Sequence, residues 1–163
     1  MQQPHIREFY HKKSVATWEE TRAEYLRRLH PDWPTKCFLS CAGAVAVGYI
    51  QAYRVADYPE YAAMIGEKKG ISLDLFIGDE RFVGRGWGRL ILVKFLNQVA
   101  FPLFHPEHVC FIYHDRLNYR ALGASRAAGF RHVRDFTEEG DLKELLALRR
   151  EEASAHAASV VIE

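Results

Sequence analysis

The sequence predicts an α/β or α+β fold, in which helices pack against a mixed β-sheet. Segments with helical periodicity alternate with short β-rich segments, in the order helix, hairpin, strand, helix, strand, helix, strand, strand. A glycine-rich loop joins one of these strands to the helix that follows it. The 163 residues, 48% apolar and 26% charged, are enough for one globular domain with a sizeable core.

The N-terminal third predicts a helix followed by a β-hairpin. The pattern Thr-x-x-Glu at residues 17–20 is typical of a capping box, and Pro31 ends the helix that begins there. One face of this helix carries Trp18, Tyr25, Leu26 and Leu29. Short β-rich segments at 37–41 and 44–53, joined by a turn signal at Gly43, predict the hairpin.

The centre of the chain predicts one strand leading into one helix. Residues 55–69 are expected to form a connection, and residues 71–77 a strand. A loop over 78–85 leads into a helix over 86–100, which Pro102 ends.

The C-terminal part predicts a strand, a helix and further strands. Residues 109–113 form the strand, Asn118 caps the helix, and Gly129 takes the left-handed position after it. Residues 131–136 are strand-like, whereas 143–148 fit a strand or a helix.

The chain shows no internal repeat and no linker between domains. We expect residues 1–150 to form one domain and residues 151–163, rich in alanine and serine, to form a flexible tail. His105 and His108 lack further ligands at suitable spacing, so no metal site is expected.

Composition excludes several classes of partner. The formal net charge of +1 gives no general attraction for nucleic acid or an anionic membrane. No apolar run approaches the roughly 20 residues that span a bilayer, and residues 1–13 lack the apolar centre of a secretory signal. The three cysteines lie in apolar segments and favour buried, reduced thiols over disulfides, with a catalytic thiol as the lesser alternative. We therefore expect a cytoplasmic protein.

The loop after the central strand carries the clearest chemical signal. Its sequence runs Arg81-Phe82-Val83-Gly84-Arg85-Gly86-Trp87-Gly88. Gly84 and Gly86 have no Cβ, so backbone amides can approach an anion closely, and the next helix adds unpaired N–H groups and the positive end of its dipole. The loop predicts a pyrophosphate site, to which Arg81, Arg85 and Arg89 can add charge-assisted hydrogen bonds.

Two other nucleotide-binding loops do not fit this segment. A P-loop needs Gly-Lys followed by Ser or Thr, and the chain has none. The dinucleotide fingerprint needs glycine where Arg89 stands, and it follows the first strand of its domain rather than a hairpin. A glycine-rich turn without a ligand remains the alternative.

The spacing Arg81-x-x-Gly84-x-Gly86 resembles the Gln/Arg-x-x-Gly-x-Gly/Ala signature of the GNAT acetyltransferase superfamily. The similarity runs from about residue 37 to residue 150. Within that superfamily the chain resembles the aminoglycoside 6′-N-acetyltransferases at residues 47–51, 74–79, 84–88, 118–122 and 128–130. The resemblance implies a mixed, mostly antiparallel sheet with a V-shaped splay, acetyl-CoA as co-substrate, and acetylation of an aminoglycoside, which confers antibiotic resistance.

The resemblance also implies how acetyl-CoA is held. Its pantetheine arm would pair with the backbone of Leu75, Phe76 and Ile77, and its pyrophosphate would lie on the amides of residues 83–89. Asn118 would help to hold the arm. The implied site consists of Leu75, Phe76, Ile77, Arg81, Phe82, Val83, Gly84, Arg85, Gly86, Trp87, Gly88, Arg89 and Asn118.

Asp74 is the main candidate for positioning or deprotonating the amine. It is the one acidic residue in an apolar strand, and it matches an acidic position of the aminoglycoside enzymes; the alternative is a solvated strand residue. Two family features are missing. Ser125 replaces the tyrosine that protonates the thiolate in many members, and Tyr113 replaces an aspartate of the aminoglycoside enzymes. Asp115 and the phenol of Tyr113 are the candidates to take the role of that missing aspartate.

Other polar and aromatic residues fit either the acceptor site or an ordinary structural role. Carboxylates in expected loops would attract a polycation or simply face solvent: Asp57, Glu60, Asp79, Glu80, Asp135, Glu138, Glu139 and Asp141. Tyrosines in and after the hairpin would line a sugar site or pack in the core: Tyr49, Tyr53, Tyr58 and Tyr61.

The N-terminus departs from the family pattern. GNAT proteins open with a strand, and residues 1–13 contain no clear one. A missing strand would leave an exposed sheet edge and favour a homodimer. We expect a small-molecule amine, most simply an aminoglycoside, as the acceptor. The alternatives are another amine, such as a siderophore lysine, a polyamine or a peptide, and a CoA-binding protein with impaired catalysis.

Overall fold

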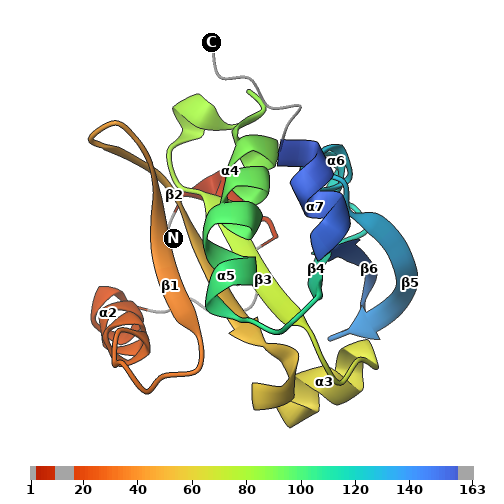
Figure 1. Ribbon diagram of the computed structural model, residues 1–163. Coiled ribbons are helices and arrows are strands. Elements are labelled where there is room, and N and C mark those ends of the chain that lie inside the picture. Colours follow the sequence, from red (N-terminus) through yellow and green to blue (C-terminus); the bar gives the residue numbers. More distant parts are fainter. Residues whose placement is uncertain (1–2, 10–16, 158–163) are drawn as a thin grey trace.

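The computed structural model describes residues 3–9 and 17–157. Its centre is a six-stranded mixed sheet in the order β1-β2-β3-β4-β6-β5, with helices on both faces (Figure 1). The strands are β1 (Lys36–Ala42), β2 (Val45–Arg54), β3 (Ile71–Ile77), β4 (Val109–Asp115), β5 (Arg131–Glu138) and β6 (Asp141–Arg149). Neighbouring strands are antiparallel except β3 and β4, which are parallel. The mixed, mostly antiparallel sheet is therefore confirmed.

The helices alternate with these strands. They are α1 (Pro4–Arg7), α2 (Trp18–Arg28), α3 (Pro59–Ile65), α4 (Trp87–Phe95), α5 (Phe101–Leu103), α6 (Tyr119–Ala127) and α7 (Arg150–Ala157). Two 3₁₀ segments, η1 (Val55–Asp57) and η2 (Glu80–Phe82), and a π-helical segment, η3 (Leu96–Ala100), join them. Of the helices in the described ranges, none is long and apolar enough to cross a membrane.

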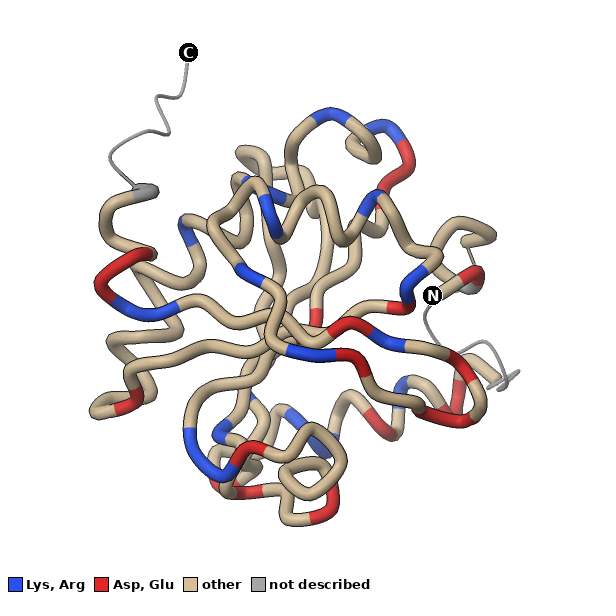
Figure 2. Tube along the Cα trace, turned by 90° about the vertical axis from the view of Figure 1, so that its right-hand side faces the viewer, with Lys and Arg blue, Asp and Glu red and all other residues tan. Residues whose placement is uncertain are grey.

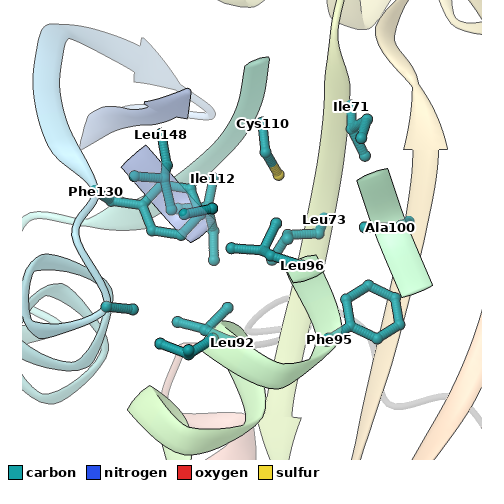
Figure 3. Close-up of a cluster of buried hydrophobic side chains, with 14 of the residues drawn as sticks. Ile71, Leu73, Leu92, Phe95, Leu96, Ala100, Cys110, Ile112, Phe130 and Leu148 are labelled. Atoms are coloured by element: carbon teal, nitrogen blue, oxygen red, sulfur yellow. The ribbon is translucent and has the colours of Figure 1, made fainter. Parts of the chain in front are cut away.

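The main core fills the face of the sheet that α4, η3 and α7 cover (Figure 3). Its buried side chains include Ile71, Leu73, Leu92, Phe95, Leu96, Ala100, Cys110, Ile112, Phe130 and Leu148. Successive side chains of a strand point to opposite faces. Because Ile71 and Leu73 point into this core, Ser72 and Asp74 of β3 must point to the other face.

A smaller core lies on that other face, beneath α3. It consists of Val55, Ile65, Phe111 and Leu145, and the rings of Tyr61 and Tyr113 pack against it. Helix α3 lies inside the connection expected over 55–69 and adds a helix that the sequence did not predict. The helix begins at Pro59, where a missing N–H is harmless, and ends at Gly66 in a left-handed conformation (φ 65°).

Helix α2 begins as predicted but faces solvent. The Thr17 N–H donates to Oε2 of Glu20 (2.8 Å), and the Glu20 N–H donates to Oγ1 of Thr17 (3.2 Å), which completes the capping box. The apolar face, however, is open, with Trp18 71% and Leu29 66% exposed. The helix lies beside the edge strand β1, away from the centre of the sheet (Figure 1).

The end of the central helix also differs from the prediction. Helical backbone continues past Pro102 to Leu103, through the wider turns of η3. Pro102 lies in the first turn of α5, where proline is tolerated.

The C-terminal residues are more ordered than expected. The ambiguous segment 143–148 lies within strand β6. In place of a flexible tail, residues 150–157 form α7, where Ala153 is 1% exposed and its carbonyl accepts from Nδ2 of Asn97 (3.1 Å). The rest of that predicted tail, 158–163, lies outside the described residues.

In the described ranges, no strand precedes β1. Residues 3–9 contain the short helix α1, and residues 1–2 and 10–13 of the predicted strandless segment lie outside the described residues. The strand with which GNAT proteins open is therefore missing from these ranges, and β1 is an edge of the sheet.

Candidate active site between two diverging strands

The site begins where β3 and β4 separate. The two strands pair in parallel only at Ile71–Cys110 and Ser72–Phe111, although each strand is seven residues long. Beyond Ser72 no pairing between them is present, so one backbone edge of β3 faces a gap.

Hydrogen bonds at the two ends of β3 identify that edge. The Gly78 N–H donates to the Val47 carbonyl (2.8 Å), and the Gly70 carbonyl accepts from the Val55 N–H (2.9 Å). Both bonds run toward β2. Because the backbone groups of a strand alternate between its two edges, even-numbered residues of β3 face β2 and odd-numbered residues face the gap.

Leu75 and Ile77 therefore present their N–H and C=O groups to the gap. An extended ligand can pair with such an edge as an added strand would. The Ile77 carbonyl is already bonded to Nε2 of His5 (2.9 Å), so α1 lies at the open end of this edge.

The glycine-rich loop closes one end of the gap. Gly84 (φ 73°) and Gly86 (φ 82°) are both left-handed, a conformation that side chains with a Cβ disfavour. The Leu90 N–H donates to the Gly86 carbonyl (3.2 Å), which is the first backbone hydrogen bond of α4. The N–H groups of the first turn therefore have no acceptor within the helix. These donors and the helix dipole form an anion site.

The arginines of the loop are not equivalent. Arg81 is 76% exposed and pairs with Asp79, with Nη2 2.6 Å from Oδ2. Arg85 and Arg89 pair with no carboxylate in the described part of the chain, and the buried Nε of Arg89 has no hydrogen-bond partner there. Unneutralised guanidinium groups beside free helix amides fit a phosphate ligand.

Helix α6 packs against the start of α4. A Cβ at Gly88 would lie 3.1 Å from that of Ala124, so the two helices approach closely there. Asn118 caps α6, because its Oδ1 accepts from the Ala121 N–H (3.1 Å). The predicted cofactor residues thus lie on the end of β3, on the glycine-rich loop, and at the starts of α4 and α6, and the side chain of Arg81 is used within the loop.

Asp74 lies on the face of β3 opposite the main core. Its Oδ2 accepts from Nε2 of Gln51 (2.7 Å), the residue directly opposite it on the neighbouring strand β2. Tyr53, Tyr61 and Tyr113 pack beside it, with ring centres 5.5 Å apart between Tyr53 and Tyr61. Burial, and then the negative charge of Asp74, raises the pKa of Tyr53 and Tyr113 well above the usual range. These phenols remain protonated and can only donate or accept hydrogen bonds.

Residues 1–138 match the family model described as an acetyltransferase (GNAT) domain. The chain belongs to the GNAT acetyltransferase family. It is an enzyme that transfers acetyl from acetyl-CoA to an amine. No curated protein matches the sequence.

Several solved structures share this GNAT fold. An uncharacterized protein from Bacillus halodurans has a TM-score of 0.83 at 14% identity, over 98% of this chain and 80% of that one. The aminoglycoside acetyltransferase AAC(6')-Ib in complex with paromomycin and acetyl-CoA has a TM-score of 0.73 at 18% identity, over 94% of this chain and 85% of that one. A spermidine N-acetyltransferase from Vibrio cholerae with CoA and spermine has a TM-score of 0.70 at 13% identity, over 92% of this chain and 85% of that one.

This GNAT enzyme places a carboxylate next to the tyrosine that replaces the family aspartate. The Tyr113 hydroxyl donates to Oε1 of Glu138 (2.9 Å), near the tip of the β5–β6 hairpin, where acidic positions gather (Figure 2). Asp115, the other candidate, is held elsewhere: its Oδ1 accepts from the Leu117 N–H (3.0 Å), and Lys143 Nζ lies 3.4 Å from its Oδ2. The sequence placed Glu138 only among loop carboxylates, since its contact depends on strand register.

The other departure from the family, Ser125, lies in a pair that sequence reasoning missed. Its Oγ is 2.8 Å from Nε2 of His114, and both residues lie between β4 and α6. Burial, and then the positive charge of Arg126, lowers the pKa of His114 to about 4. The imidazole is therefore neutral at neutral pH.

Proposed function

We propose that this GNAT enzyme acetylates a primary amine of a polycationic small molecule, with an aminoglycoside 6′-amine as the preferred acceptor and Asp74 as the base. The observation that carries the proposal is the position of Asp74 on β3, two residues past the last pairing with β4. A second carboxylate, Glu138, lies on the same side of the sheet beside Tyr113. Two carboxylates on one wall suit an acceptor with several ammonium groups.

The chemistry follows from this arrangement. The acceptor arrives as an ammonium ion, and Asp74 accepts one of its protons. The freed lone pair attacks the thioester carbon, the C–N bond forms, and the C–S bond breaks. The nitrogen loses a second proton, and the departing thiolate takes up a proton to leave as coenzyme A. The N–H groups of Leu75 and Ile77 on the gap edge would polarise the carbonyl oxygen.

Acetyl-CoA would lie along the same opening. Leu75 and the N–H of Ile77 would pair with its pantetheine arm, whereas the backbone of the predicted residue Phe76 faces β2 instead. Asn118 would hold that arm from the start of α6. The first-turn amides of α4 would bind the pyrophosphate, together with the loop from Gly84 to Arg89. Phe82 and Val83 would support that loop, because their N–H groups already donate to the carbonyls of Asp79 and Glu80. Arg85 and Arg89 support this arrangement because their charges are not neutralised by carboxylates of the described chain. Arg81 would contribute by shaping the loop, because both its N–H and its guanidinium group donate to Asp79.

A polyamine is the second candidate acceptor. The similar spermidine N-acetyltransferase structure, which contains CoA and spermine, favours this alternative. Both acceptor classes carry several ammonium groups, so the two carboxylates suit either of them.

A thiol-release assay with acetyl-CoA tests the proposal. The panel should contain kanamycin, spermidine, an N6-hydroxylysine and a peptide amine. Turnover on kanamycin with a higher kcat/KM than on the other amines supports the proposal. A higher kcat/KM on spermidine would transfer the assignment to the second candidate. Binding of coenzyme A without release of thiol on any amine would contradict catalysis.

A homodimer through β1 is a separate proposal. Strand β1 is an edge of the sheet and exposes Leu39. Exposed edges can pair with a second chain. Analytical ultracentrifugation should give twice the mass of one chain, and a single-chain mass at micromolar concentration would contradict the proposal.

A further inference from the structure

We propose that Arg28 and Gln51 act in series to orient the carboxylate of Asp74, so that helix α2 belongs to the acceptor site. The inference rests on the proposed role of Asp74 as the base. It assigns positioning roles to two residues from different elements, α2 and β2.

Gln51 is well placed to fix Asp74. The two residues face each other across β2 and β3, and Nε2 of Gln51 is 2.7 Å from Oδ2 of Asp74. Gln51 is 8% exposed, so its amide must find hydrogen-bond partners inside the protein.

The other end of the Gln51 amide determines which way it points. Its Oε1 lies 2.7 Å from Nη1 of Arg28 and 2.6 Å from the Tyr49 hydroxyl. A guanidinium group can only donate, so the amide oxygen must face Arg28. The nitrogen must then face Asp74. If the Gln51 amide were flipped, its NH₂ group would face the N–H groups of Arg28, and its oxygen would face the carboxylate oxygen of Asp74.

Arg28 is itself held in place. It forms an ion pair with Glu24 one turn earlier and lies over the ring of Tyr25, with Cζ 4.9 Å from the ring centre. Tyr25 in turn meets Tyr49 edge to face at 5.2 Å. Helix α2 has no buried residue, and these side-chain contacts link it to β2. The position of α2 is thereby transmitted to Asp74.

Substitutions in the full chain test whether Arg28 acts on Asp74 through Gln51. Arg28→Met and Gln51→Leu should each lower kcat with the amine by about tenfold or more, because each removes a hydrogen bond to a charged group. The Kd for coenzyme A should not change. Arg28→Lys, which keeps a donor, should recover part of the lost kcat. Arg27→Met, one position away on the exposed side, is the matched control and should match the wild type.

A double variant distinguishes action in series from two separate actions. If Arg28 acts only through Gln51, Arg28→Met should cause no further loss in the Gln51→Leu background. Multiplied losses, or an unchanged kcat in either single variant, would overturn the inference while leaving the proposed function intact. A wild-type protein without turnover on any amine would remove the proposed function.

A measurement that needs no turnover tests the same link. The side-chain amide protons of Gln51, assigned in NMR spectra by their loss in Gln51→Leu, should exchange slowly with solvent. Arg28→Met should increase that exchange at least tenfold. Equal exchange in Arg28→Met and the wild type would show that Arg28 does not hold the amide, and the inference would be wrong.

Discussion

The two halves of the site are built in different ways. The proposed cofactor half is made mainly of backbone: two left-handed glycines, the first-turn amides of α4, and the edge of β3 beyond its last pair with β4. The proposed acceptor half is made of side chains from separate elements, namely Arg28, Gln51, Asp74, Tyr113 and Glu138. A backbone site survives many side-chain changes, whereas a side-chain site can change its acceptor through single substitutions. Substitutions in one half should therefore leave the other half's affinity unchanged.

The largest expected effect is in the acceptor half. Asp74→Asn removes the proposed base and should lower kcat by about a hundredfold or more, while the Kd for coenzyme A stays constant. Steady-state kinetics and calorimetry measure the two quantities. Asp57→Asn, an exposed carboxylate on η1, is the control and should match the wild type. Unchanged turnover in Asp74→Asn would remove Asp74 from the mechanism.

The second effect concerns pH and comes from His114, on the core-facing side of β4. Burial and Arg126 lower its pKa from the ordinary 6.5 to about 4 in the folded protein. The unfolded chain binds a proton as pH falls below about 6.5, and the folded protein does not until about pH 4. This group therefore lowers the free energy of unfolding between those pH values, by up to about 3 kcal/mol.

His114→Gln keeps a hydrogen-bonding partner for Ser125 but does not titrate. Urea unfolding between pH 7 and 4 should show a smaller loss of stability in this variant than in the wild type. His105→Gln, in an exposed loop, should retain the wild-type slope. Equal slopes in His114→Gln and the wild type would contradict a buried neutral imidazole.

A third effect isolates the backbone of the cofactor half. Gly86 is left-handed (φ 82°), and a Cβ there would meet no protein atom within 4 Å, so Gly86→Val strains the backbone without a clash inside the protein, and its side chain stands where an anion would approach the amides. The strain of about 1–2 kcal/mol should weaken coenzyme A binding by roughly tenfold. Gly123→Ala in α6, which is also unobstructed, should bind as the wild type does. An unchanged Kd in Gly86→Val would mean that the loop conformation does not matter for binding.

The smallest effect tests how α2 supports the acceptor half. Thr17→Ala removes the capping hydrogen bond to the Glu20 N–H and should cost about 1 kcal/mol of stability. Because α2 carries Arg28, the KM for the amine should rise slightly while the Kd for coenzyme A stays constant. Thr21→Ala, inside the same helix, should be neutral or stabilising. A change in coenzyme A affinity would show that the halves are coupled.

Features that depend on local rules could be predicted from the amino-acid sequence alone. The capping box at Thr17, the hairpin around Gly43, the strand 71–77 and the glycine loop at 84–86 follow from turn chemistry, periodicity and backbone freedom among neighbouring residues. These features include most of the cofactor half, and they also made the resemblance to GNAT acetyltransferases visible.

Features that depend on pairing between distant segments could not be predicted and became visible in the folded chain. The register of β2 on β3 brings Gln51 to Asp74, and the register of β5 on β6 brings Glu138 to Tyr113. A shift of one residue would turn each side chain to the other face, and nothing in the local sequence fixes that choice. The order of α7 also came from packing, because an Ala-rich segment becomes a stable helix only where the rest of the fold buries one of its faces.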